Sequence, residues 1–236
     1  MSSIFTALSG LRAEAVRIDN AAHNIANLNT SGFRSRRLLQ STGPAGDHVT
    51  ISATALSLSQ GGLRPTGNPL DLAIDGQGFF QVSLPDSSTA YTRAGQFTTN
   101  SDGLVVDLNG NPLKPPISIP PSADNVVIDS SGQVSTVVDG STVTLGSVLV
   151  ATFNNPEGLS AIGNNLFKAT SASGEPSFGP AGADGRGQMV SGFVEGSNVA
   201  PADQIIDLMV AGHSAAFNLK TIRAQDDLTK SLLNRP

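Results

Sequence analysis

The two ends of the chain carry apolar residues at the spacing of amphipathic helices, and this pattern most constrains how the chain can fold. Apolar residues recur at alternating steps of four and three, which is the heptad spacing of a helix with one apolar stripe. The N-terminal seam consists of Ile4, Leu8, Leu11, Ala15, Ile18, Ala22 and Ile25. The C-terminal seam consists of Ala202, Ile205, Met209, Gly212, Ala216 and Leu219. We expect the two helices to pack against each other through these seams, and the resulting pairs to pack against other copies of the chain.

The helix boundaries follow from residues that start or stop helices. The first helix is predicted over residues 3–28, because Asn29 and Gly32 tolerate positive φ where it ends. The last helix is predicted from Pro201, which suits a first helical turn, to about Leu233. A single helix with one uncovered stripe is marginal in water, so these ends are expected to fold on docking.

The middle of the chain has the pattern of short strands. Residues 38–66 are predicted to be a joint with one β segment, because apolar residues alternate from Val49 to Ala55 and turn-formers precede them. From 67 to 194, apolar pieces alternate with turn pairs, and residues 171–187 form a loop. The predicted turns are Asp75-Gly76, Asp102-Gly103, Asn109-Gly110, Ser131-Gly132 and Asp139-Gly140.

These patterns together predict an α+β fold with an antiparallel, β-rich central body. The body spans residues 67–194, and residues 1–37 and 195–236 supply terminal helices that pair as a coiled coil. Apolar residues make up 39% of the 236, which allows a core, while 25 Gly and 14 Pro fit a body with many turns. A chain whose ends are adhesive helices and whose middle is compact is typical of a polymer subunit.

Charge and composition exclude several classes of function. The net charge is −5, which disfavours nucleic-acid binding because phosphates require a basic face. The local basic cluster of Arg34, Arg36 and Arg37 is typical of a solvated helix end. The chain has no cysteine, so disulfides and thiolate metal sites are excluded. We expect no membrane span and no cleavable signal peptide, so any export would use another route.

Enzymatic chemistry finds no support in the spacing of the polar residues. His23, His48 and His213 are not at metal-ligand spacing, and each has a structural or surface interpretation. Asp107 begins a sequence similar to a calcium loop, but the closing Glu is missing, so a hairpin turn is predicted. Asp71 and Asp75 would lie about 13 Å apart on a strand, too far for a carboxylate pair. The sequence therefore predicts no enzyme, no metal site and no cofactor.

Four segments carry a resemblance to a known family. The first runs from 24 to 34, the second from 60 to 80, the third from 91 to 104 and the fourth from 192 to 199. Their motif residues are Asn24, Asn27, Gly32, Phe33, Gly67, Asn68, Pro69, Leu70, Asp71, Glu195, Ser197 and Asn198. In order and content, these segments are similar to the bacterial flagellar axial proteins, in particular the basal-body rod proteins.

The resemblance implies a structural role in the flagellum. A rod protein of this family is a subunit of a helical tubular polymer, with its terminal helices in an inner coiled-coil D0 domain and its β-body as D1. The implied partners are other copies of the chain, other rod and hook subunits, the flagellar export apparatus and the surrounding ring proteins. The implied location is the periplasmic rod of the basal body, reached through the type III export system, and the implied function is to transmit torque from motor to hook.

Two details bear on the kind of rod protein. The phrase from Thr66 to Ile74 and the segment 153–167 are more similar to the distal-rod type, and the proximal-rod type or a hook-related protein is the alternative. In the last helix, where the family usually has Gln-Arg-Ala-Tyr, this chain has Gly212-His213-Ser214-Ala215. A more remote alternative is a cell-envelope β-sandwich that binds glycans. It leaves both seams unexplained, and the chain has no Trp and one Tyr for sugar stacking.

Overall fold

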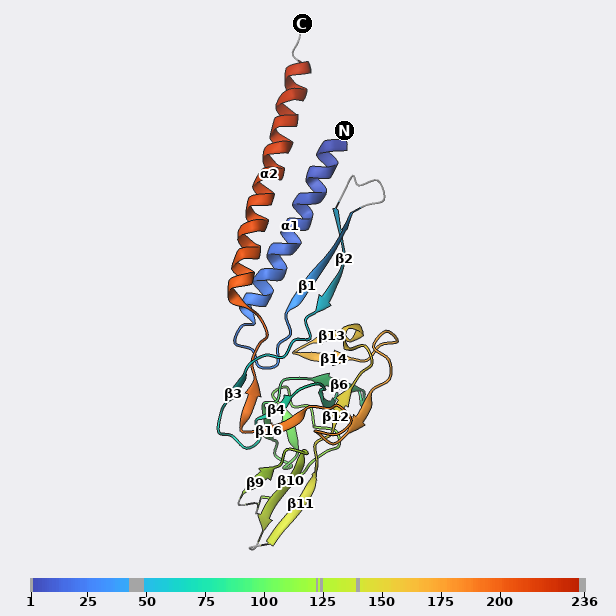
Figure 1. Ribbon diagram of the computed structural model, residues 1–236, viewed down its shortest axis with the longest axis vertical. Helices are drawn as coiled ribbons and strands as arrows, with labels where there is room; N and C mark the ends of the chain where they lie inside the picture. Colours follow the sequence, from blue (N-terminus) through green and yellow to red (C-terminus); the bar gives the residue numbers. More distant parts are fainter. Residues whose placement is uncertain (1, 43–48, 122, 124, 139–140, 234–236) are drawn as a thin grey trace. The chain divides into compact units, whose positions relative to one another are not determined.

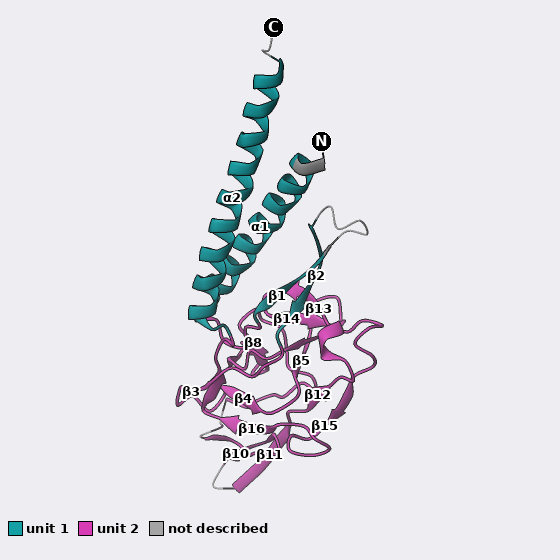
Figure 2. Ribbon diagram, turned by 45° about the horizontal axis from the view of Figure 1, so that its top comes forward, with its two compact units in different colours: residues 1–28, 35–57, 199–236 teal, residues 29–34, 58–198 magenta. Residues whose placement is uncertain are grey.

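The computed structural model describes residues 2–42, 49–121, 123, 125–138 and 141–233. The chain divides into two compact units, drawn in different colours in Figure 2. Unit 1 comprises residues 1–28, 35–57 and 199–236, and unit 2 comprises residues 29–34 and 58–198. The chain therefore passes from unit 1 into unit 2 twice and returns twice. The division predicted from the sequence is different: terminal helices at 1–37 and 195–236, a joint at 38–66 and a body at 67–194. It stays a prediction.

Unit 1 consists of two helices and a hairpin. The helices are α1 (Ser2–Ala26) and α2 (Pro201–Leu233), and the strands are β1 (Arg36–Thr42) and β2 (Val49–Leu56). The helices run side by side in opposite directions (Figure 1). Strands β1 and β2 pair antiparallel and contact α1. Strand β1 was not predicted from the sequence. Its first two residues, Arg36 and Arg37, belong to a basic cluster that is typical of a solvated helix end.

The ends of both helices have local causes. After α1 the backbone closes two tight turns, since Asn27 N donates to Asn24 O and Leu28 N donates to Ile25 O. Helix α2 begins at the predicted proline, has Asp203 in its first turn and has Lys230 in its last, which complements the helix dipole at both ends. Both predicted helices are therefore present, with bounds close to those expected.

Unit 2 is built from short strands joined by turns, as expected for a β-rich body. Its first half contains β3 (Leu63–Pro65), β4 (Leu72–Asp75), β5 (Phe80–Ser83), β6 (Thr89–Thr92), β7 (Phe97–Thr99), β8 (Val105–Asp107) and β9 (Val126–Ile128). Its second half contains β10 (Gln133–Val138), β11 (Ser141–Ser147), β12 (Val150–Thr152), the 3-10 turn η1 (Pro156–Gly158), β13 (Ser160–Gly163), β14 (Leu166–Lys168), β15 (Ser177–Gly179), β16 (Gln188–Ser191) and β17 (Phe193–Glu195). Strand β15 lies inside the segment predicted to be a loop.

The strand pairs of unit 2 are antiparallel throughout the named ladders. The largest sheet has the order β13-β14-β6-β5, and β11-β10-β9 form a three-stranded sheet. The last strands of the unit pair with its first, since β16 pairs with β4 and β17 with β3. This pairing brings residues just before α2 next to residues that follow the hairpin of unit 1. It also positions Glu195 deep inside unit 2.

The core of unit 2 lies between these short sheets. Apolar side chains from most of the strands contribute to it, among them Leu72, Ile74, Phe80, Val82, Phe97, Val134, Val150, Leu166 and Met189. Four of the five predicted turns have their glycines at positive φ, namely Gly76, Gly103, Gly110 and Gly132. The fifth predicted turn, at 139–140, lies outside the described residues.

Candidate assembly interface

The contact between α1 and α2 uses small side chains. Ala211 is fully buried, and Asn218 lies seven residues further on the same face of α2. A Cβ added at Gly10 of α1 would lie only 2.8 Å from the side-chain nitrogen of Asn218. Small residues on both helices therefore allow their backbones to approach closely.

Polar pairs across the same contact fix the register of the helices. Arg17 Nη2 donates to Asp207 Oδ1 at 2.9 Å. Asn24 Nδ2 donates to Gln204 Oε1, also at 2.9 Å. Because a low residue number on α1 meets a high one on α2 and the reverse, these pairs require an antiparallel arrangement. The α1–α2 contact is thus close and polar and buries few large apolar groups.

The C-terminal seam lies on another side of α2. Ile205 is 52% exposed, Met209 55% and Leu219 42%. Ala216 is exposed, and a Cβ added at Gly212 would meet no atom within 4 Å. Contrary to the expectation from spacing, the α1–α2 contact within one chain does not use this seam. The physical reason is that the face with Ala211 and Asn218 lets the backbones come closer and supplies polar partners.

The side chains of the N-terminal seam are more buried than those of the C-terminal seam, but none of those described is fully buried. Half-buried side chains occur at Leu8, Leu11, Ile18 and Ile25, whereas Ala15 and Ala22 are exposed. The alanines of α1 that are fully buried lie outside the seam, at positions Ala7, Ala13 and Ala21. Both seams therefore leave apolar surface in contact with solvent, and their assignment to an assembly interface stays a prediction.

A second exposed stripe on α2 was missed by the sequence reasoning. Ile206, Val210, Phe217 and Leu228 are all exposed. Their steps of 4, 7 and 11 return to the same side of a helix, so they form one stripe beside the C-terminal seam. The signal was present in the sequence, but the neighbouring seam fitted the heptad pattern over more positions. Helix α2 thus presents apolar side chains on two neighbouring sides.

The segment Gly212-His213-Ser214-Ala215 divides between two environments. Ser214 and Ala215 are half-buried, whereas Gly212 and His213 are exposed. The small residues of this segment therefore do not share one face of α2. Two of them belong to the buried side of α2, and Gly212 belongs to its exposed seam.

Asn24 connects α1 to the hairpin of unit 1. Its Nδ2 donates to Arg36 O and its Oδ1 accepts from Arg36 N, both at 3.0 Å, so the amide imitates a backbone partner. Asn20 Nδ2 donates to the same carbonyl at 2.9 Å. Asn27 has a more local role, because its Nδ2 donates to His23 O. The motif residues Asn24 and Asn27 therefore stabilise the local structure of unit 1.

Gly32, Phe33 and Asn198 join two segments inside unit 2. These two chain passages are residues 29–34, which follow α1, and residues 195–198, which precede α2. Gly32 N donates to Glu195 O at 2.7 Å, and Asn198 N donates to Phe33 O at 3.3 Å. Gly32 has φ +67°, and a Cβ there would lie 2.3 Å from the backbone nitrogen of Ala94. No other residue type fits this position without backbone movement. Phe33 is buried and Ser197 half-buried.

The motif from Gly67 to Asp71 forms a turn before β4. Gly67 has positive φ and its N–H donates to Gly192 O. Asn68 Oδ1 accepts from Leu70 N at 3.2 Å, and Asn68 Nδ2 donates to Asp71 Oδ1 at 3.2 Å. These contacts are typical of an Asx turn. Pro69 O accepts from Ser191 Oγ, so the motif also ties the turn to β16.

A buried ion cluster lies in unit 2. Arg34 Nη1 is 2.6 Å from Glu195 Oε1, and Arg93 Nη1 is 3.1 Å from Glu195 Oε2. Glu195 Oε1 also accepts from Gly61 N at 2.9 Å. Burial lowers the pKa of Arg93 to about 10, against the opposing effect of the Glu195 carboxylate. Arg93 is therefore still charged at neutral pH. The expectation that Arg34 belongs to a solvated helix end is wrong.

The other candidate polar residues do not form a metal or catalytic cluster among the residues that the structure describes. His23 and His213 are exposed, and His48 lies outside the described residues. Among the described residues, no three acidic, histidine or cysteine side chains form a group that could hold a metal ion. Within the same residues, no helix is both long and apolar enough to cross a bilayer.

Three family models match successive parts of the chain. Residues 4–34 match the model of flagella basal body rod proteins, and residues 73–136 match the flagellar hook protein FlgE/F/G D1 domain. Residues 190–235 match the C-terminal model of flagellar basal body rod FlgEFG proteins. The first and last models cover the terminal helices, and the middle one lies within unit 2.

Curated relatives extend the match to nearly the whole chain. Flagellar basal-body rod protein FlgG of Caulobacter vibrioides is 35% identical, over 98% of this chain and 98% of its own. FlgG of Bacillus subtilis is 34% identical, over 99% of this chain and 98% of its own. FlgF of Caulobacter vibrioides, another basal-body rod protein, is 29% identical over 99% of this chain and 97% of its own.

Proposed function

The chain belongs to the family of flagellar basal-body rod proteins of the FlgG type, and we propose that the outward apolar faces of its terminal helices join successive copies into the rod. It is a structural subunit of the flagellar basal body. The proposal concerns how one copy attaches to the next, and it assigns this task to the N-terminal and C-terminal seams.

The single observation that supports the proposal most strongly is the exposure of the C-terminal seam. Ile205, Met209 and Leu219 are each about half exposed although α1 lies beside α2. Burying a side chain of this size contributes roughly 1.5–3 kcal/mol. A second helix from another copy is the natural cover, because the seam has the heptad spacing at which helices pack side by side.

The two exposed sides of α2 suit a closed tube better than a dimer. A dimer needs one apolar face per chain, whereas a subunit inside a tube has neighbours on more than one side. The seam would meet one neighbour, and the stripe of Ile206, Val210, Phe217 and Leu228 would meet the next. In this arrangement the terminal helices form the coiled-coil D0 layer, and unit 2 corresponds to the D1 body.

The distal-rod type is favoured over the proximal-rod type by identity within one organism. In Caulobacter vibrioides, FlgG is 35% identical to this chain and FlgF 29%. The D1 model covers hook and rod proteins together, whereas the nearly full-length relatives described above are rod proteins, which favours a rod protein over a hook-related one. The chain would therefore occupy the distal rod.

The other partners follow from this position. The subunit would contact other rod and hook proteins along the axis, pass through the flagellar type III export apparatus, and turn inside the surrounding ring proteins. The rod would transmit torque from motor to hook without any catalytic step in this chain. The matching family models describe rod and hook segments and no catalytic family.

The burial of Tyr91 disfavours a glycan-binding function. Tyr91 is the single tyrosine of the chain and the chain has no tryptophan. Its side chain is only 4% exposed and packs edge-on against Phe153, so its face is not free to stack on a sugar. The β-body therefore offers no exposed Tyr or Trp to a sugar, and Phe178, at 48% exposed, is its exposed large aromatic side chain among the described residues.

Localisation in isolated basal bodies tests the function. An epitope inserted in the exposed turn at Asn109 should appear on the rod by immunogold microscopy, and deletion of the gene should leave basal bodies without a complete rod. Absence of the protein from basal bodies, together with normal swimming of the deletion strain, would overturn the assignment.

A further inference from the structure

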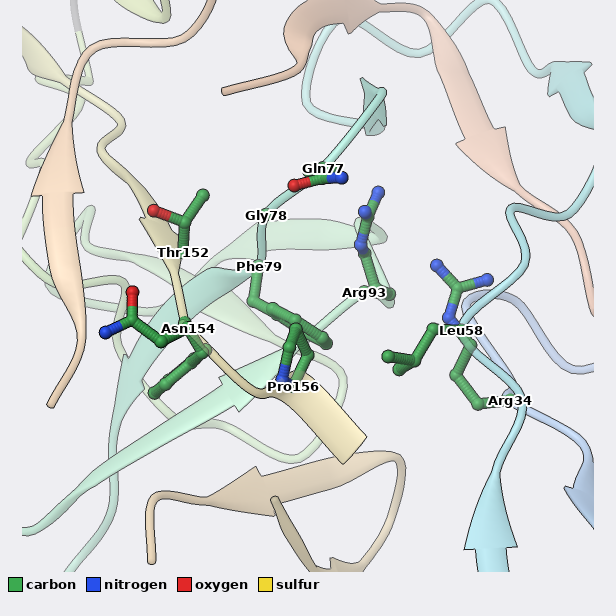
Figure 3. Close-up of a pocket in the computed structure, with 10 residues that line it drawn as sticks. Arg34, Leu58, Gln77, Gly78, Phe79, Arg93, Thr152, Asn154 and Pro156 are labelled. Atoms are coloured by element: carbon green, nitrogen blue, oxygen red, sulfur yellow. The ribbon is translucent and has the colours of Figure 1, made fainter. Parts of the chain in front are cut away.

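A pocket of about 300 Å³ lies within unit 2 beside the buried ion cluster. In Figure 3, the guanidinium groups of Arg34 and Arg93 lie on one side of the pocket, and Thr152 and Asn154 lie on the other. Gln77 lies at its edge and Phe79 between the two sides. All of these residues belong to unit 2. The volume is at the lower end of the range of small-ligand sites.

The charges at the pocket are unbalanced. The described ion pairs of Arg34 and Arg93 share one carboxylate, that of Glu195, so the cluster keeps one net positive charge. Arg34 is 3% exposed, Arg93 5% and Glu195 0%. A buried charge without a counter-ion is costly, because water cannot solvate it.

Hydrogen-bond donors of the same arginines are also unsatisfied. The Nε–H of Arg34 and that of Arg93 are buried and meet no acceptor in the part of the chain that the structure describes. Glu195 does not satisfy them, since its oxygens accept instead from Arg34 Nη1, Arg93 Nη1 and Gly61 N. Two buried donors and one excess positive charge therefore lie next to one pocket.

We propose that this pocket binds a carboxylate group carried on a short, partly apolar frame. The carboxylate would balance the excess charge and accept from the arginines, in charge-assisted hydrogen bonds that are stronger than neutral ones. Phe79, Leu58 and Pro156 supply apolar walls for the frame, and the amides of Gln77 and Asn154 supply polar contacts at the rim. An acidic side chain on a peptide has this chemistry. The inference does not depend on how copies of the chain assemble.

Nuclear magnetic resonance of the full chain, at a concentration where it is monomeric, tests the proposal. The probe is N-acetyl-glutamate N-methylamide, and its uncharged counterpart is N-acetyl-glutamine N-methylamide. The acidic probe should shift the Nε–H signals of Arg34 and Arg93 and the amide signal of Thr152 in a saturable way. The glutamine counterpart should bind at least about tenfold more weakly, because it lacks the charge.

A variant with an internal carboxylate separates the pocket from non-specific effects. Gln77 is exposed at the rim, so Gln77→Glu should fold normally and place a negative charge beside the arginines. Binding of the acidic probe should weaken at least about tenfold in this variant. Gln133→Glu is the matched control, because Gln133 is exposed on β10 and lies outside the pocket. This control should bind like the wild type.

The source of the carboxylate is distinguished by a dilution series without probe. If the same signals move as the wild-type chain is concentrated, an acidic side chain of another copy fills the pocket. If they move only with the probe, the ligand is a free acid. Either result supports a carboxylate site. The proposal is overturned if the acidic probe gives no saturable shifts, if the glutamine counterpart binds equally well, or if Gln77→Glu leaves binding unchanged.

Discussion

The Arg34 guanidinium lies 2.6 Å from the Glu195 carboxylate, and both side chains are shielded from solvent. Arg34 comes soon after the end of α1, and Glu195 comes shortly before the start of α2. The pair therefore fastens the two chain passages that lead to the terminal helices, inside unit 2. Arg93 occupies the other oxygen of the same carboxylate, so one acidic residue holds three segments together.

Glu195→Gln should destabilise unit 2 strongly. The substitution removes the carboxylate but leaves two buried guanidinium groups, which typically costs about 3–5 kcal/mol. Urea unfolding, followed by the near-ultraviolet signal of the aromatic core, measures the change. Glu157→Gln is the control, because Glu157 is exposed and makes no described ion pair. Equal stability of the two variants would show that the cluster does not support the fold.

Gly32→Ala should also destabilise the crossing of the two chain passages. At φ +67° an L-residue is strained, and the new Cβ would press against the backbone of Ala94. We expect a loss of about 1–3 kcal/mol in the free energy of unfolding. Gly62→Ala serves as the comparison, since a Cβ there meets no atom within 4 Å. A stable Gly32→Ala variant would mean that this backbone relaxes without cost.

Limited proteolysis of the free chain should remove the terminal helices and spare unit 2. The α1–α2 contact consists of small residues and polar pairs, so it buries little of the apolar surface that stabilises helices. Mass spectrometry of the resistant fragment should give ends near residues 29 and 198. A fragment that keeps both helices would show that they are stable without neighbouring copies.

Ala216→Leu should block assembly while leaving export intact. Ala216 is exposed in a single chain, so a larger side chain has room there. Against a second helix in the polymer, the added atoms would overpack the contact by roughly 1–3 kcal/mol for each subunit. The variant should therefore be found in the culture medium with no rod on isolated basal bodies. Ala216→Ser, which keeps the side chain small, should assemble. Normal swimming of the Ala216→Leu strain would refute this role.

The elements of the fold were largely predictable because they depend on local sequence. Heptad spacing and the proline at Pro201 indicated both helices, and the glycine turns indicated the β-body. The pattern could not say which face of α2 meets α1, because a seam records apolar spacing and not the identity of its partner. The actual contact depends on Ala211 and Gly10, whose small size is informative only when the other helix is in place.

The ion cluster and its pocket were not predictable for a different reason. Arg34, Arg93 and Glu195 lie far apart in the chain and meet only in the folded unit, where β17 pairs with β3, Gly32 N donates to Glu195 O, and Arg93 donates to Ile74 O. Arg34 was read as part of a helix end, since three neighbouring arginines usually face solvent. Strand β1 was missed because Arg36 and Arg37 begin it. In both cases tertiary contacts overrode a local pattern.

Rod formation in a strain whose chain carries Met209→Asp tests the central claim most directly. Met209 is 55% exposed, so the substitution should leave the free chain folded, with the same urea unfolding curve as the wild type. In the polymer it would bury an unpaired carboxylate between helices, at a cost of several kcal/mol in each subunit. Met209→Leu, which keeps the seam apolar, is the control. The account predicts secreted protein, no complete rods in electron micrographs of basal bodies from the Met209→Asp strain, and normal rods with Met209→Leu. Complete rods in the Met209→Asp strain would contradict it.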